Sequence, residues 1–159
     1  MKAAEGKTPK AVSNRQARVM ALQVLYALEQ GCGTVADALV AVLEEQEIPD
    51  DQRAFGARLV NLALEHRDEI RDEIRASVSN WDFDRIAMVD RVLVELGIAE
   101  IRMVPSTPVK VALSEYQSIA RKFSTEDSPR FVGGVLNVVA RKCTNIDSDS
   151  ASRSETTEG

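Results

Sequence analysis

The chain has 159 residues, of which 44% are hydrophobic and 4% aromatic, and its formal net charge is −5. This length is enough for one domain with a real core, and the shortage of Gly, Pro and aromatic side chains favours a helix-rich protein over a β-sandwich. No apolar run approaches the roughly 18 residues of a membrane span and no signal-peptide pattern opens the chain, so a cytoplasmic protein is expected.

The two cysteines, Cys32 and Cys143, lie far apart in the sequence, with no CxxC pattern and no histidine at ligand spacing. We therefore expect two free thiols, without a metal site or a cofactor. Residues 1–18 hold five basic side chains against one acidic, so this part carries +4 and the rest of the chain carries −9. An acidic body with a basic start will not coat nucleic acid indiscriminately, but it can grip a short run of phosphates.

The chain opens with a segment that is not expected to fold by itself. Residues 1–12 have few apolar side chains and contain a glycine and a proline, which predicts a flexible basic arm. A helix can begin at Ser13, because Ser13 and Gln16 have the spacing of a capping box. It then presents an apolar stripe and ends at the Gly-Cys-Gly sequence of residues 31–33.

Two arginines mark the start of this first helix. Arg15 and Arg18 lie one turn apart near its positive end, where cations slightly destabilise a helix. A pair placed against local stability has two interpretations. It is either an ordinary pair of surface arginines or a pair kept for function.

Helical spacing continues through the middle of the chain. Residues 34–47 have the pattern of a second amphipathic helix, and Pro49 with Asp50 makes the turn that follows. From Asp51 to Val78 the apolar side chains keep a helical period over more residues than a typical globular helix contains. A bend or break is therefore expected at 66–68.

The stretch from Phe83 to Ile101 is apolar around most of its helical circumference, so it is predicted to be a central helix packed on more than one side. Two acids, Asp90 and Glu100, interrupt its apolar rows. A buried carboxylate is costly unless it is hydrogen-bonded or paired. We expect each acid to cap a neighbouring helix or to meet an arginine, with the alternative for Asp90 that its row faces another protein.

Two further helices are predicted after the central one. Thr107 as N-cap with Pro108 at the first helical position starts the first of them. Ser128 with Pro129 repeats this signal for the last helix, which is expected to end at about Lys142.

The last helix contains two adjacent glycines. Gly133 and Gly134 each cost roughly 1 kcal/mol relative to alanine, and the close approach of a neighbouring backbone is the expected compensation. Beyond it, residues 144–159 are Ser, Thr, Asp and Glu with scarcely a core residue, which predicts a disordered acidic tail. The folded domain is therefore expected at 13–143.

Several segments resemble, in order and spacing, those of the NusB family of bacterial transcription antitermination factors. The most specific are Pro-Val-Lys-Val-Ala at 108–112, Ala-Arg-Lys-Phe at 120–123, Glu-Asp-Ser at 126–128 and Arg-Phe-Val-Gly-Gly-Val-Leu at 130–136. Support comes from Arg-Gln-Ala-Arg at 15–18, Ala-Leu-Gln-Val-Leu-Tyr at 21–26, Asp-Arg at 90–91 and Ile-Ala-Glu-Ile at 98–101. The resemblance runs from about Arg15 to Lys142.

This resemblance implies an all-α fold, a compact seven-helix domain made of two packed three-helix bundles. It implies no enzymatic activity. It also implies that the protein binds boxA-type RNA of ribosomal RNA operons together with the ribosomal protein NusE, and that it acts on the transcription elongation complex.

Carried over by matching position, Arg15 and Arg18 fall in the family's arginine-rich, RNA-contacting start. Asp127 and Phe131 match positions linked to RNA contact beside that start. Lys10 joins them as an RNA-binding candidate, because lysines of the arm can compensate where the family's other contacts are missing.

Two residues match positions that the family uses toward NusE. They are Asp90, at an acidic position of the partner-facing surface, and Tyr26, the tyrosine of the first helix. The chain departs from the family pattern at Gly133, which stands where the family has an asparagine, and at Asn14 and Gln16, where basic residues are common. We expect a weaker RNA affinity from these departures.

The physical chemistry of the candidate residues agrees with RNA binding. Arg15 and Arg18 can bond phosphates, and Phe131 can stack on an unpaired base, a contact worth about 1–3 kcal/mol. The alternative for Phe131 is a buried packing aromatic. Since the chain has few cations, a basic second protein such as NusE would supply the missing positive charge.

Two other classes of protein remain open from sequence. One is a helical protein–protein interaction module or homodimer without direct RNA binding. The other is an enzyme, or the detached accessory domain of an RNA methyltransferase, but the chain has no GxGxxG loop, Walker motif, HExxH motif or nucleophile elbow. The sequence does not distinguish a monomer from a dimer.

Overall fold

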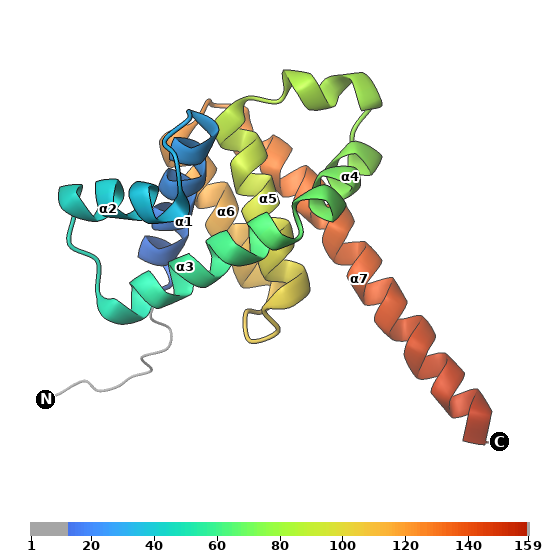
Figure 1. Cartoon of the computed structure of the whole chain (residues 1–159). Coiled ribbons are helices and arrows are strands. Elements are labelled where there is room, and N and C mark those ends of the chain that lie inside the picture. Colours follow the sequence, from blue (N-terminus) through green and yellow to red (C-terminus); the bar gives the residue numbers. More distant parts are fainter. Residues whose placement is uncertain (1–12, 159) are drawn as a thin grey trace, which may run out of the picture. The chain divides into compact units, whose positions relative to one another are not determined.

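The computed structural model describes the backbone of residues 13–158 and, within it, the side chains of residues 13–79 and 82–143. Over this backbone it contains seven α helices, one 3-10 helix and no strand (Figure 1), which confirms the predicted all-α fold. No helix in the described part is both long and apolar enough to cross a membrane. The chain divides into two compact units, Met1–Asn61 and Leu62–Gly159. The predicted arm at 1–12 lies outside the described residues.

The first unit contains α1, α2 and most of α3. These helices span Arg15–Glu29 (α1), Val35–Glu45 (α2) and Asp50–Glu65 (α3). α2 begins with a capping box, in which Thr34 Oγ1 accepts the N–H of Asp37 and Asp37 Oδ2 accepts the N–H of Thr34, both at 3.1 Å. The bond from the backbone of Thr34 holds the pKa of the Asp37 carboxyl below its usual value.

The capping box predicted at Ser13 does not form. The N-cap of α1 is Asn14, and its side chain bonds no N–H of the helix. Ser13 Oγ instead accepts the N–H of Arg15 at 2.9 Å. The N–H of Ala17, which a capping side chain would have bonded, donates to Gln52 Oε1 of α3 at 3.1 Å. A residue distant in sequence therefore replaces the local cap.

The contact of α3 with α1 is close. Besides accepting from Ala17, Gln52 donates from Nε2 to Asn14 Oδ1 at 3.1 Å. One turn further along α3, a Cβ added at Gly56 would lie 2.8 Å from the carbonyl oxygen of Ala17. Only glycine permits this approach, so α3 lies against the backbone of α1 at its start.

The second unit is built around α5. Its elements are α4 (Arg67–Ser77), the 3-10 helix η2 (Asn80–Arg85), α5 (Met88–Met103), α6 (Val109–Phe123) and α7 (Ser128–Glu158). α5 contacts α4, α6 and α7, and its residues 92–100 are all buried. Figure 1 shows α6 and α7 beside it. The prediction of a central helix packed on several sides is confirmed, as is the break near His66, which separates α3 from α4.

The central helix starts later than predicted. Phe83 lies in η2, where it is buried and its ring is 4.2 Å from the guanidinium carbon of Arg75. The backbone is extended at Ile86, and α5 begins only at Met88. Apolar spacing suits a short 3-10 turn as well as the first turn of an α helix, so periodicity alone could not locate this boundary.

Two buried acids of α5 find partners in this unit. Glu95 Oε2 accepts from Arg71 Nε of α4 at 2.7 Å and from Arg91 Nη1 at 3.4 Å. Glu100 is fully buried, and its Oε1 accepts the hydroxyl of Tyr116 of α6 at 2.7 Å. The expectation that Glu100 is bonded inside the fold is confirmed, and Tyr116 is one of its partners.

The last two helices differ from the prediction at their ends. The N-cap of α6 is Pro108 rather than Thr107. The backbone of α7 continues to Glu158, beyond the predicted end at about Lys142 and through the segment expected to be a disordered tail. Adding residues to an existing helix requires no new nucleation, which explains how a segment without a core stripe continues one.

Both cysteines are free, as expected. The glycines of α5 and α7 have different surroundings. A Cβ at Gly97 of α5 would lie 2.6 Å from Leu136 Cδ1 of α7, and one at Gly133 would clash with the side-chain amide of Gln117 of α6. At Gly134 an added Cβ meets nothing within 4 Å. The close neighbour predicted for the glycine pair is therefore present at Gly133, where it is a side chain, and absent at Gly134 among the described residues.

This difference gives a prediction about stability. Gly134→Ala should raise the free energy of unfolding by about 0.5–1 kcal/mol, because alanine favours the helix and the added methyl group has room. Gly133→Ala should raise the free energy of unfolding by less, or lower it, because Gln117 must move and its 3.1 Å bond to the carbonyl of Pro129 is lost. Urea unfolding followed by circular dichroism measures both. An equal gain for the two variants would show that Gln117 does not constrain this position.

Candidate functional site

Arg15 is exposed in the first turn of α1. This turn contains no acidic side chain, so the positive end of the helix is not neutralised locally. A guanidinium beside a helix N-terminus favours an anion such as a phosphate. The sequence placed Arg15 correctly at this helix end.

Arg18 lies one turn later, but it is buried, with 2% of its surface exposed. Its guanidinium carbon is 5.9 Å from the centroid of the Phe55 ring of α3. Leu22 and Leu25, one and two turns further along α1, are also buried, so Arg18 extends their stripe. The interpretation of Arg18 as an ordinary surface arginine is therefore wrong, because its alkyl stem packs into the fold.

Tyr26 is exposed to 40% near the end of α1. Large aromatic side chains are rarely left this exposed, and tyrosine is favoured at protein–protein contacts. The partner-binding role that the family resemblance implies for Tyr26 stays a prediction.

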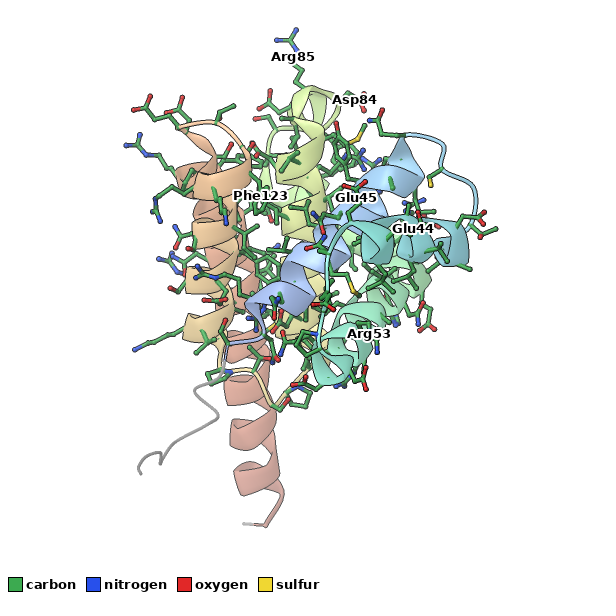
Figure 2. All side chains as sticks on the ribbon, turned by 90° about the vertical axis from the view of Figure 1, so that its left-hand side faces the viewer. Glu44, Glu45, Arg53, Asp84, Arg85 and Phe123 are labelled. Carbon is green, nitrogen blue, oxygen red and sulfur yellow. The ribbon has the colours of Figure 1, made fainter. Side chains whose placement is uncertain are left out.

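Asp127 and Phe131 lie where α6 turns into α7. Asp127 is exposed, and its carbonyl oxygen accepts the N–H of Phe131 at 3.2 Å. Phe131 is half-buried and forms part of the wall of an open cavity of about 390 Å³. The rest of the wall consists of Val78, Asp82, Arg85, Ile86, Ala87 and Asp90. Figure 2 shows the side chain of Arg85 extending outward. Phe131 is therefore not the fully buried packing aromatic of the alternative, and its stacking role stays a prediction.

Asp90 lies in the first turn of α5, with 8% of its surface exposed. Its Oδ1 accepts the hydroxyl of Ser124 at 2.6 Å, and its Oδ2 accepts the hydroxyl of Ser128 at 2.9 Å. Asp90 is thus hydrogen-bonded inside the fold, through the hydroxyls of two serines and not through the predicted helix cap or arginine pair. Its small exposed edge lies on the wall of the same cavity as Phe131.

The two serines that bond Asp90 were not predicted from the sequence. They are four residues apart and flank the turn, a spacing that gives no signal until α5 is known to lie beneath it. No role was predicted either for three exposed cations on the two sides of this turn, Arg121, Lys122 and Arg130. Lys122 Nζ lies 5.6 Å from the ring of Phe123, whose exposed position on α6 is visible in Figure 2.

The candidate residues thus form one group in each unit. In the first unit, Arg15, Arg18 and Tyr26 lie along α1. In the second unit, Asp90 and Phe131 line one cavity, and Asp127 directly precedes a serine that Asp90 bonds. Lys10 lies outside the described residues. Among the described residues, no cluster of three or more His, Cys, Asp or Glu side chains could hold a metal ion.

The fold is all-α. An exposed arginine lies at the start of one helix, and an aromatic side chain lies beside a polar turn at the start of another. These features are typical of a helical protein that binds a partner. A model of the NusB family matches residues 15–141. The transcription antitermination protein NusB of Myxococcus xanthus is 37% identical over 132 residues, which are 80% of this chain and 94% of that protein. The chain belongs to the NusB family.

Other comparisons agree with this. The NusB protein of Geobacter sulfurreducens is 36% identical over 129 residues, covering 80% of this chain and 94% of the relative. A crystal structure of antitermination factors NusB and NusE in complex with dsRNA contains a chain that is 27% identical and superposes with a TM-score of 0.73. The match covers 80% of this chain and 96% of that one.

The burial of Arg18 gives a prediction. Arg18→Ala should lower the free energy of unfolding by about 1–3 kcal/mol, because it removes a packed side chain. Arg15→Ala, at an exposed position, should change it by no more than about 0.5 kcal/mol. Urea unfolding of the two variants compares them directly. Equal stabilities would mean that Arg18 packs no more tightly than a surface side chain.

Proposed function

We propose that this protein is a transcription antitermination factor that binds boxA-type RNA of ribosomal RNA operons together with the ribosomal protein NusE. Its membership of the NusB family carries this proposal. The structure of NusB and NusE with dsRNA supports it, since that NusB chain matches most of this one. A factor acting on nascent transcripts works in the cytoplasm, and it has no enzymatic activity.

The RNA-binding candidates remain Arg15, Arg18, Asp127, Phe131 and Lys10. Support comes from the exposure of Arg15 and Asp127 and from the partly open ring of Phe131, which can stack on an unpaired base. Arg18 would have to act from a buried position, so Arg15 is the stronger candidate for a direct phosphate contact.

For NusE, the candidates are Tyr26 and Asp90. Tyr26 offers an exposed ring, which suits a direct contact. Asp90 offers only the small edge that faces the cavity, because both of its carboxylate oxygens are already bonded to serines. The net charge of −5 favours a basic partner of this kind.

The RNA assignment predicts a specific loss in one variant. Arg15→Ala should raise the dissociation constant for boxA RNA about three- to tenfold at low salt, as expected for the loss of one phosphate contact. The slope of log K against log salt should become shallower by about 0.7. Fluorescence anisotropy with labelled boxA and scrambled RNA, in the presence of NusE, measures both quantities.

Arg58→Ala serves as the matched control, because Arg58 is an exposed arginine of the same unit and its removal changes the net charge equally. This control should bind boxA as the wild type does. If Arg15→Ala also binds like the wild type at every salt concentration, Arg15 does not contact the RNA. Binding of NusE without any preference for boxA would favour a protein–protein interaction module, and light scattering would show whether the protein is a homodimer.

A further inference from the structure

The turn between α6 and α7 is held by a cluster of side-chain hydroxyl groups. It contains Ser124, at the C-cap of α6, Ser128, at the start of α7, and Thr125 between them. The oxygens of Ser124 and Ser128 lie 2.9 Å apart, and those of Thr125 and Ser128 also lie 2.9 Å apart. Both serines bond the carboxylate of Asp90. These three hydroxyl groups and the carboxylate of Asp90 therefore form one polar cluster beneath the turn.

One arrangement of the protons makes four of these contacts hydrogen bonds, while the 2.9 Å contact between the two serine oxygens then carries no proton. Each hydroxyl has one proton, and the two serines donate theirs to the two oxygens of Asp90. Thr125 then donates its own hydroxyl proton to Ser128 Oγ, which also accepts the N–H of Thr125 at 3.1 Å. The chain of bonds ends at the carboxylate of Asp90, which has only acceptors. Ser128, which is 1% exposed, is the centre of the cluster.

This arrangement fixes both ends of the turn to one side chain of α5. The short segment between the two serines contains Asp127, and Phe131 follows three residues after Ser128, in the first turn of α7. A short loop with both ends anchored has few conformations left, so Asp127 and the start of α7 are held in place before any ligand binds. Binding to a fixed surface loses less conformational entropy than binding to a mobile one.

We propose that Asp90, Ser124 and Ser128 are positioning residues for RNA binding, which act by holding the turn that presents Asp127 and Phe131. This inference rests on the proposed function. It gives Asp90 a role that does not depend on direct contact with a partner protein. It also explains why an acid is placed on the buried face of α5 opposite two serines, where an apolar residue would leave the hydroxyls of the turn without acceptors.

Ser124 is the best residue to test, because it is only partly buried and its extended backbone suits a β-branched residue. Ser124→Ala removes the 2.6 Å bond to Asp90, whereas Ser124→Thr keeps the hydroxyl. Ser114→Ala, at an exposed position of α6, is the control for removing a serine hydroxyl from the same helix. The experiment measures binding of boxA and scrambled RNA with NusE present, binding of NusE alone, and amide hydrogen exchange at residues 125–127.

Ser124→Ala should raise the dissociation constant for boxA about three- to tenfold, the effect of losing one hydrogen bond that orders the site. Amide exchange in the turn should become faster. NusE binding without RNA should fall less than boxA binding, because Tyr26 and the bond from Ser128 to Asp90 are kept. A merely destabilised protein would lose both ligands together. Ser124→Thr should have the wild-type affinity and exchange rates. The control Ser114→Ala should have them as well.

Two failures are distinguishable. If the wild type binds boxA and scrambled RNA equally well, the proposed function fails and the positioning role fails with it. If the wild type prefers boxA but Ser124→Ala binds it with unchanged affinity, the function stands and the positioning role is overturned. A Ser124→Thr variant that is as weak as Ser124→Ala would also overturn it, since the hydroxyl would then not be the group that matters.

Discussion

The second unit depends on how α5 satisfies the acids that it buries. A carboxylate inside a helical core is strongly destabilising unless other groups bond it. Each of the three acids has a partner on a different element: Glu95 bonds Arg71 of α4, Glu100 bonds Tyr116 of α6, and Asp90 bonds the serines around the start of α7. Apolar packing alone would tolerate small shifts of these helices along α5. The four directional bonds, made at three different positions along α5, do not, so they fix the position of each helix against it.

The same constraint connects the core to the candidate site. Asp127 and Phe131 are near the surface, but the turn that carries them is bonded to a buried side chain. Packing between α5 and α7, where Gly97 admits Leu136 at close range, supports the rest of the helix. The turn between α6 and α7 has a defined shape, because the buried residues that bond it leave few backbone conformations open to it. The rigid part of the molecule thereby determines the geometry offered to a ligand.

The sequence predicted what periodicity and local signals encode. Helical stripes located the helices, and the break at His66 followed from the length of the pattern. Two of the three buried acids of α5, Asp90 and Glu100, were identified as needing partners, but Glu95 was not. The sequence did not predict the contacts that are made by residues far apart in the chain. Gln52 of α3 replaces the local cap of α1, and Phe83 packs under Arg75 in a 3-10 turn. The burial of Arg18 was not predicted for the same reason. The ring of Phe55 that it packs against comes from another helix.

The burial of Arg18 changes the electrostatic account of RNA binding. Counted from the sequence, the start of α1 offers two guanidinium groups. In the structure Arg15 is exposed and Arg18 is not, so less of this positive charge reaches the surface. With a net charge of −5, the protein attracts RNA weakly at long range. Its affinity must then come mainly from fixed short-range contacts and from a basic partner. Under the proposed function, the turn that Asp90 holds in place would supply such fixed contacts. Joint binding with NusE would supply the missing positive charge.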